Sequence, residues 1–494
     1  MNKILFCAAL LFLVHPAAAK TLAVSSAAEI KKMSKILLPG DTVIMKSGEW
    51  KDEQIVLRAN GTESRPIVVR AEQAGKTVLT GTSQFRFSGS FIIVDGLLFT
   101  NGGLETKGKA VIEFRTSSAD EAVHCRVTNC AIVNYNPPDK FLDYKWVSLY
   151  GSDNRVDHSY FSGKNHQGTL LVVWLDSLPN RHHIDHNFFG PRPEHGQNGA
   201  EIIRVGTSDW SMFSSQTVVE NNYFYSCDGE VEIISNKSCD NVYRYNTFVE
   251  CAGSLTLRHG NRSDVYGNYF FGHHKKRTGG VRVIGEDHRV YNNYFDGLEG
   301  DNQYSALSFM RGKLNSKPNG YFQVKNAVIA FNTFVDNNNG IVLGVQGSDP
   351  DADLPPVNCR IANNLIVKNR GMIINEKDPP ENSVYEGNLI DGDISAIHSA
   401  SQFRPHSVSM VKDSDTVWRL DRTSSAIDAA AGAYDFITTD IDGQQRTGIK
   451  DVGADECIPS DSIRHPLRRI DVGPEWEAGA FIELHKYEGI NHVP

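Results

Sequence analysis

Apolar and polar residues alternate along much of the chain with a period near two. The segments VYRYNTFV (242–249), DVYGNYFF (264–271) and RVYNNYFD (289–296) show this alternation and are rich in Val, Tyr and Phe. A helix would need apolar residues at a spacing of three to four, whereas a period of two is typical of β-strands. Gly, Asn and Asp separate these segments, so the pattern predicts short strands joined by turns and an all-β fold.

The same phrase, an Asn followed by two aromatic or aliphatic residues, returns many times. In the central part of the chain it recurs every 22 to 25 residues, and the longer gap from Asn293 to Asn332 predicts an inserted loop. A repeat of this length with short strands predicts a solenoid, here a right-handed parallel β-helix. The repeated asparagines are Asn187, Asn222, Asn246, Asn268, Asn293, Asn332, Asn364 and Asn388.

These asparagines and the residues after them are expected to build the rod without taking part in chemistry. Each Asn is expected in a turn, where it tolerates unusual backbone angles and can form a hydrogen bond to the Asn of the next coil. The Phe or Tyr that follows is expected to stack inside the core.

The ends of the rod can also be predicted. Residues 26–37 have the spacing of a short amphipathic helix that would cap the N-terminal end of the solenoid. The repeat fades after Ser395, and residues 441–456 are interpreted as a final turn and strand. We therefore expect a β-helix domain over 20–460 and a C-terminal extension over 461–494.

The first nineteen residues have the features of a secretory signal peptide. Lys3 precedes an apolar run over 4–14, and Ala17 to Ala19 provide a small-residue cleavage site. Cys7 lies inside the apolar run and not behind it, which disfavours a lipid anchor. No later stretch is long enough for a membrane span. We expect the mature protein to be secreted or periplasmic, and monomeric.

Charge and cysteine content exclude some classes of partner and fold. The formal net charge is -9 and no basic block occurs, which argues against a nucleic-acid partner. An acidic protein can still bind a polyanion in a locally basic groove. Seven cysteines follow the signal peptide, too few for a disulfide scaffold, and their odd number requires at least one free thiol.

Two carboxylates and two cations form the candidate chemistry. Glu230 and Glu232 are two residues apart, so on a strand they share one face at a like-charge cost that a bound cation would offset. Lys237 and Arg258 are 21 residues apart, close to one coil. Neighbouring coils are about 4.8 Å apart, so these two side chains are expected to stand side by side.

Such a cluster suits β-elimination from a polymer of uronic acids. The hydrogen at C5 can be removed only if the adjacent carboxylate is neutralised and the resulting enolate is stabilised by positive charge. Calcium, a hard cation with oxygen ligands, would supply that charge from Glu230 and Glu232. Lys237 would be the base, and Arg258 would stabilise charge or protonate the departing glycosidic oxygen.

These residues also carry a family resemblance. The run Glu230 to Ser238, the run Leu257 to Gly260 and the phrase FGPRPEHGQNGAEIIRVG (189–206) resemble polysaccharide lyase family 6, the alginate lyases and chondroitinase B. The resemblance extends over most of 21–456. It implies alginate as the substrate, with dermatan sulfate as the alternative. It assigns Lys237 as base, Arg258 as acid, and Asn198, Glu230 and Glu232 as calcium ligands.

Three further residues have two interpretations each. His259 adjoins Arg258 and would contact substrate or assist proton transfer, or else be a turn histidine. Arg204 and Arg282 would pair with substrate carboxylates, or else lie on the solvated surface. The metal has an alternative as well, since an Arg or Lys of the same groove could neutralise the substrate carboxylate without calcium.

Two other functions compete with the lyase. A glycoside hydrolase needs two carboxyl groups flanking the bond, but Glu230 and Glu232 would stand about 7 Å apart on the same side of a threaded sugar. A non-catalytic glycan-binding rod would leave the pairing of Lys237 with Arg258 without a purpose. The sequence therefore favours the lyase.

Overall fold

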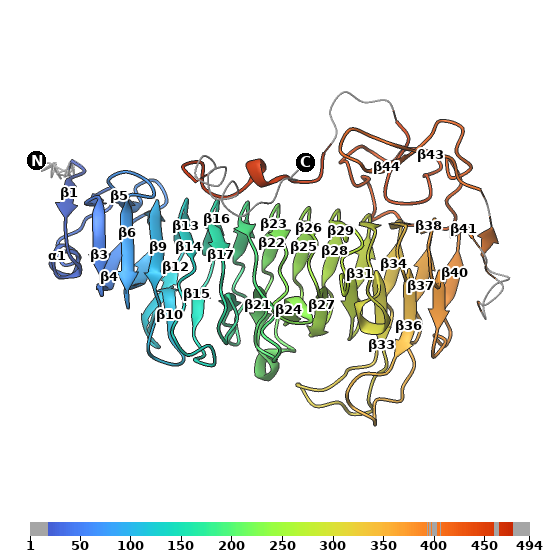
Figure 1. The fold of residues 1–494 in the computed structure, drawn as a ribbon, viewed down its shortest axis with the longest axis horizontal. Coiled ribbons are helices and arrows are strands. Elements are labelled where there is room, and N and C mark those ends of the chain that lie inside the picture. Colours follow the sequence, from blue (N-terminus) through green and yellow to red (C-terminus); the bar gives the residue numbers. More distant parts are fainter. Residues whose placement is uncertain are drawn as a thin grey trace, which may run out of the picture.

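The chain winds into a long parallel β-helix, as predicted (Figure 1). The computed structural model describes residues 18–392, 394, 397, 403–405, 407–458 and 464–477. Most of the predicted signal peptide, 1–17, lies outside the described residues, as do 461–463 and 478–494 of the predicted extension. Among the described residues no helix is both long enough and apolar enough to span a bilayer.

The first sheet runs the whole length of the rod with parallel neighbours. Its strands in spatial order are β1 (Thr21–Val24), β2 (Thr42–Met45), β5 (Ile67–Ala71), β8 (Ile92–Asp95), β13 (Arg126–Thr128), β16 (Arg155–Asp157), β19 (His183–Asp185), β22 (Val218–Glu220), β25 (Val242–Arg244), β28 (Asp264–Tyr266), β31 (Arg289–Tyr291), β34 (Val328–Ala330), β37 (Arg360–Ala362) and β40 (Val384–Glu386).

The second sheet carries the candidate residues. Its order is β11 (Arg115–Ser117), β12 (Asp120–Val123), β7 (Gln84–Ser90), β10 (Ala110–Glu113), β15 (Lys145–Leu149), β18 (Leu171–Val173), β21 (Ile203–Gly206), β24 (Glu232–Lys237), β27 (Ser254–His259), β30 (Val281–Val283), β33 (Leu307–Met310), β36 (Ile341–Val345) and β39 (Ile374–Glu376), and β4 (Gln54–Asn60) also pairs with β7.

The third sheet completes each coil. Its order is β3 (Gly48–Lys51), β6 (Thr77–Gly81), β9 (Leu97–Gly102), β14 (Ala131–Val133), β17 (Tyr160–Ser162), β20 (Phe188–Phe189), β23 (Tyr223–Tyr225), β26 (Thr247–Val249), β29 (Tyr269–Phe271), β32 (Tyr294–Asp296), β35 (Thr333–Val335), β38 (Leu365–Val367), β41 (Leu389–Asp391) and β42 (Arg404–Pro405). Short 3₁₀ turns occur at η1 (Ser208–Trp210), η2 (Asn302–Tyr304) and η4 (Arg469–Asp471).

The predicted N-terminal helix is present and is shorter than expected. Helix α1 (Ala27–Met33) begins after Ser26, whose hydroxyl accepts a hydrogen bond from the amide of Glu29. Ile30 is fully buried, and the helix packs against β4 at the N-terminal end of the rod (Figure 1). The hydroxyl cap satisfies an amide that has no partner within the helix.

The repeated asparagines form a buried hydrogen-bonded ladder, as predicted. The side-chain oxygen of Asn246 accepts a hydrogen bond from the backbone N–H of Asn222 at 3.0 Å. The side-chain oxygen of Asn268 accepts one from the backbone N–H of Asn246, also at 3.0 Å. The expectation of unusual backbone angles at the Asn itself was wrong, because the residue before it takes the left-handed conformation. Tyr245, before Asn246, has φ of 57°.

Only one residue of each pair after the Asn stacks inside the rod. The stack uses the second residue of the pair, and its successive ring centroids lie 4.5 to 4.9 Å apart. Because side chains alternate along a strand, the first residue of each pair points outward, so the prediction was wrong for that position. The stacked rings are Phe189, Phe224, Phe248, Phe270, Phe295 and Phe334.

The C-terminal part of the chain folds back along the outside of the third sheet (Figure 1). It includes the hairpin of β43 (Met410–Lys412) and β44 (Trp418–Leu420), and Val417 and Leu420 pack with Tyr269 and Tyr294. The strand predicted within 441–456 is absent from this described segment, which forms turns around the buried pair Arg446–Glu456 at 2.6 Å.

The cysteines behave as small buried side chains. All seven cysteines that the structure describes are free, and six of them are buried. This confirms the prediction of at least one unpaired thiol.

Candidate active site

Parallel pairing brings the candidate residues together on the outward face of the second sheet. Gly206 of β21 pairs with Lys237 of β24, and Lys237 in turn pairs with His259 of β27. The register shifts between Asn236 and Lys237, which leaves Arg258 in a β-bulge. Lys237 therefore stands beside His259, and the bulge re-aims the side chain of Arg258.

A second row runs parallel to the first. Arg204, Ser235, Thr256 and Arg282 are successive register partners across β21, β24, β27 and β30. Arg204 and Arg282 thus lie on either side of the strands that carry Lys237 and Arg258. Arg282 is only 3% exposed, so the alternative of a solvated surface position was wrong for this residue. Arg204 is half-buried, with its guanidinium carbon 5.3 Å from the centre of the Trp174 ring.

Three glutamates form an acidic cluster beside these cations. Carboxylate oxygens of Glu201, Glu230 and Glu232 all lie within 4.8 Å of one another, and all three residues are buried. Glu201 was not predicted. Asn198 is exposed in the loop before β21, where its main-chain carbonyl accepts a hydrogen bond from Gln167 at 2.6 Å.

A sequence signal for Glu201 existed. The triplet Glu-Ile-Ile occurs at 201–203 and again at 232–234. In the structure Ile203 pairs with Ile234, so the two triplets occupy equivalent places in successive coils. An alignment of the coils on this triplet would have placed Glu201 next to Glu232.

The crowding of the glutamates shifts their protonation. Burial raises the pKa of Glu230 to about 9, and the neighbouring charges of Glu201 and Glu232 add to the effect. Its Oε1 atom is buried without a hydrogen-bond partner among the described residues. Burial would also raise the pKa of Glu201, but the charges of Arg204 and Lys237 bring it below its usual value.

The cations contact this cluster from two sides. The Nζ atom of Lys237 is 4.0 Å from Oε1 of Glu201. Oε1 of Glu232 lies 3.7 Å from Nε of Arg258 and 3.6 Å from a terminal nitrogen of Arg282. The hydroxyl of Ser235 donates a hydrogen bond to Glu232 and fixes its other oxygen.

His259 is a buried neutral imidazole between the two predicted catalytic residues. It is 2% exposed, and burial together with the charges of Arg258 and Lys237 lowers its pKa to about 2. Its Nδ1 atom lies 3.4 Å from Nη1 of Arg258, and a neutral ring nitrogen can accept a hydrogen bond there. Its place in β27 beside Lys237 distinguishes it from a turn histidine.

Two site residues come from a loop that the sequence predicted only as an insertion. Residues 311–327 connect β33 and β34, and within them Gly320 accepts a hydrogen bond from Nη1 of Arg258 at 2.8 Å. The Tyr321 ring centre lies 4.5 Å from the same guanidinium. Neither contact has a periodic signal, because the loop departs from the repeat.

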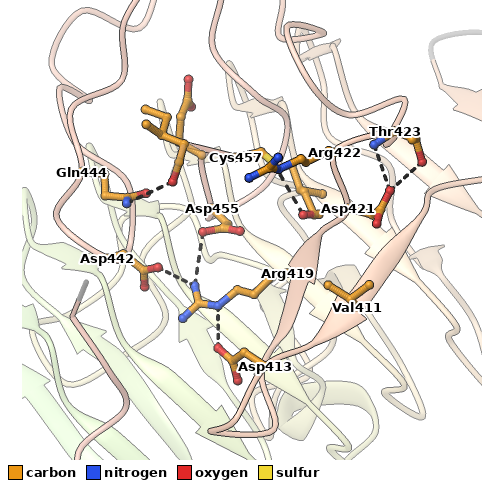
Figure 2. A pocket seen from close by; sticks show the side chains of 13 residues that line it. Val411, Asp413, Arg419, Asp421, Arg422, Thr423, Asp442, Gln444, Asp455 and Cys457 are labelled. Atoms are coloured by element: carbon orange, nitrogen blue, oxygen red, sulfur yellow. Dashed lines mark hydrogen bonds and ion pairs between the residues drawn. The ribbon is translucent and has the colours of Figure 1, made fainter. Parts of the chain in front are cut away.

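A separate cavity of about 590 Å³ lies in the C-terminal loops (Figure 2). Arg419 points into it and forms ion pairs with Asp413 at 2.9 Å, Asp442 at 2.8 Å and Asp455 at 3.2 Å. Burial raises the pKa of Asp455 to about 6, and the guanidinium offsets the negative charge. These ion pairs hold the folded-back loops together.

The second sheet thus combines a lysine, an arginine and a buried acidic cluster. The lysine can accept a proton and the arginine can stabilise or protonate a leaving oxygen. Three carboxylates with an unpartnered oxygen suit a hard divalent cation such as calcium. The set suits proton abstraction next to a carboxylate.

Comparison with known proteins identifies relatives. Residues 24–434 match the family described as Chondroitinase B. The solved PL6 family alginate lyase AlyGC is 40% identical with a TM-score of 0.77, covering 82% of this chain and 55% of that chain. This chain therefore spans little more than half the length of AlyGC.

Two further solved structures match this chain over nearly their whole length. A mannuronic acid specific family 6 lyase from human gut microbiota is 33% identical with a TM-score of 0.72, covering 79% of this chain and 92% of that chain. The PL6 family lyase Pedsa3628 from Pseudopedobacter saltans is 26% identical with a TM-score of 0.68, covering 92% and 99%. No curated protein sequence matches the chain.

Proposed function

The chain belongs to the chondroitinase B family, and the solved structures similar to it include family 6 polysaccharide lyases. On that premise we propose that it cleaves alginate by β-elimination. One observation carries the proposal: Lys237, Arg258 and the three glutamates converge on one face of the second sheet. Alginate is favoured over dermatan sulfate because the 40% and 33% identical structures are of an alginate lyase and a mannuronic acid specific lyase.

Lys237 removes the C5 proton in this mechanism. The C–H electron pair forms the C4–C5 double bond, the C4–O bond breaks, and the departing oxygen takes a proton from the side of Arg258. Burial lowers the pKa of Arg258 below its usual value, which makes this proton easier to give. The product carries an unsaturated uronate at its new non-reducing end.

Positive charge beside the substrate carboxylate makes the C5 proton removable. Arg204 and Arg282 stand on either side of the Lys237 strand pair, where forked guanidinium donors can bind a carboxylate. Glu201, Glu230 and Glu232 would hold calcium, because three hard oxygen donors converge there and one Glu230 oxygen lacks a partner among the described residues. When bound, the ion would withdraw charge from the substrate carboxylate.

His259 holds the geometry of the pair. As a neutral ring it accepts a hydrogen bond from Arg258 without adding a competing charge. It also keeps its place against Lys237 through strand pairing. Export through the predicted signal peptide, and action as a monomer, belong to the same proposal.

Ultraviolet absorbance of the unsaturated uronate tests the proposal directly. The full chain is incubated with alginate and, in parallel, with dermatan sulfate. We expect absorbance to rise with alginate. Reducing ends without absorbance would show a hydrolase, binding without either signal would show a glycan-binding rod, and a rise only with dermatan sulfate would change the substrate.

A further inference from the structure

The guanidinium of Arg258 is held mainly by a loop from the C-terminal coils. Nη1 donates to the Gly320 carbonyl at 2.8 Å, and the Tyr321 ring centre lies 4.5 Å from the guanidinium carbon. Among the described residues of its own sheet, Arg258 makes longer polar contacts, to Glu232 at 3.7 Å and to His259 at 3.4 Å. Since Arg258 also lies in a bulge, strand pairing alone does not fix its side chain.

The loop that carries Tyr321 is itself anchored. Tyr321 is 7% exposed and packs in an apolar cluster with Met310, Val342 and Val345. Its hydroxyl lies 3.4 Å from Oγ of Ser348, in the loop that follows β36. The Tyr321 side chain is therefore held by the apolar cluster and by the contact of its hydroxyl with Ser348.

Ion pairs and a second loop complete the support. Lys313 contacts Asp349 at 3.2 Å and Asp351 at 2.9 Å, which ties residues 311–327 to the loop after β36. The carbonyl of Pro318 accepts a hydrogen bond from Ser211 at 3.5 Å, in the turn that follows β21. The 311–327 loop thus reaches back across β27 and closes over Arg258.

We propose that Tyr321 is a positioning residue for Arg258, its ring fixing the plane of the guanidinium while the Gly320 carbonyl orients Nη1. This inference rests on the proposed function, in which Arg258 acts at the leaving oxygen. A planar cation lying over an aromatic face is held by the ring quadrupole. A misplacement of about 1 Å in such a group can lower turnover by about a hundredfold.

The ring face and the hydroxyl make separable predictions. Tyr321→Phe keeps the face and loses only the 3.4 Å contact to Ser348, so we expect kcat within about threefold of the parent. Tyr321→Ala removes the face, and we expect kcat to fall about ten- to a hundredfold with KM changed much less. Phe436→Ala is the matched control. It removes a ring whose centre lies 4.9 Å from the guanidinium of Arg289, a residue of the first sheet. This variant should leave kcat unchanged.

The double variant decides the matter. In an Arg258→Ala background, Tyr321→Ala should cause no further loss, because residues that act through one another are not additive. Independent, multiplied losses would overturn the inference, as would equal damage from Phe and Ala. Full turnover of Arg258→Ala alone would instead refute the proposed role of Arg258, so the two failures are distinguishable.

A folding defect has its own control. If Tyr321→Ala lowers Tm by more than a few degrees, Tyr321→Leu replaces it, because Leu keeps an apolar side chain in the cluster without an aromatic face. Turnover of Tyr321→Leu equal to that of Tyr321→Phe would overturn the inference. Loss with Leu and retention with Phe would support it.

Discussion

The Nζ atom of Lys237 lies 4.0 Å from Oε1 of Glu201, and the two residues come from adjacent coils of the rod. Glu201 is 1% exposed, so the interaction lies where water screens it weakly. Glu201 also belongs to the cluster that would bind calcium. The pair therefore links the proposed base to the proposed metal site.

Lys237→Ala should abolish most of the activity. If Lys237 removes the C5 proton, turnover of alginate should fall by about 100- to 10,000-fold, the usual contribution of a general base. The variant should remain folded, because the side chain faces outward from the rod and the stacked core is untouched. Near-normal turnover in a folded variant would show that another group takes the proton.

Arg258→Lys should rescue little of the activity lost in Arg258→Ala. A lysine ammonium is a point charge and cannot reproduce both the hydrogen bond to Gly320 and the planar contact with Tyr321. We expect both variants to lose at least about tenfold in kcat. Recovery of parental turnover with Lys would show that charge alone is needed.

The calcium requirement should change more on substitution of Glu201 than on substitution of Asn198. Chelation should abolish turnover, and added calcium should restore it and raise Tm, because a ligand that binds the folded state stabilises it. Glu201→Gln removes one charged ligand of the three, so it should require about tenfold more calcium for both effects. Asn198→Ala should behave like the parent, since Asn198 is exposed. The opposite ranking would support Asn198 as a calcium ligand in place of Glu201, and full activity in excess chelator would exclude a metal role.

Stability should fall as the pH drops below about 6.5, the usual histidine pKa. Burial lowers the pKa of His182 to about 3 and that of His288 to about 4, and the Nδ1 atom of each accepts a backbone N–H at 3.1 Å. As the pH falls, the unfolded chain binds these protons first. Each histidine should therefore lower the free energy of unfolding by about 1.4 kcal/mol per pH unit, down to its folded pKa.

Denaturant unfolding at several pH values from 7 to 4 measures the slope of the free energy of unfolding against pH. His182→Asn keeps a side-chain acceptor but cannot titrate, so its slope should be smaller than that of the parent. His124→Gln is the control, because the His124 side chain is 48% exposed. An unchanged slope in His182→Asn would assign the acid sensitivity to other groups.

Asn246→Ala should destabilise the rod. Its side chain accepts the N–H of Asn222 and donates to the carbonyls of Val219 and Arg244, each at 3.0 Å. Leaving these buried groups unpaired should lower the free energy of unfolding by about 3 kcal/mol or more. Asn165→Ala, at an exposed position, should change it by less than about 0.5 kcal/mol. Equal effects would show that the ladder does not stabilise the fold.

The repeat in the sequence was sufficient to predict the rod. A period of two within the strands and of 22 to 25 residues between Asn222, Asn246, Asn268 and Asn293 specifies parallel coils, because every coil must bury the same face. The same period placed Lys237 and Arg258 on neighbouring strands. The direction of individual side chains was harder to predict. Which of the two residues after each Asn faces inward depends on the register of the turn.

The tertiary structure decided how the site is completed. The bulge in β27 aligned Lys237 with His259 and displaced Arg258, which a regular period cannot show. Glu201 joined Glu230 and Glu232 through the pairing of β21 with β24. Tyr321 reached Arg258 from a loop outside the repeat. Periodicity determines what strand neighbours share, whereas a loop contact depends on how the inserted chain packs back on the rod, and only the folded structure contains that information.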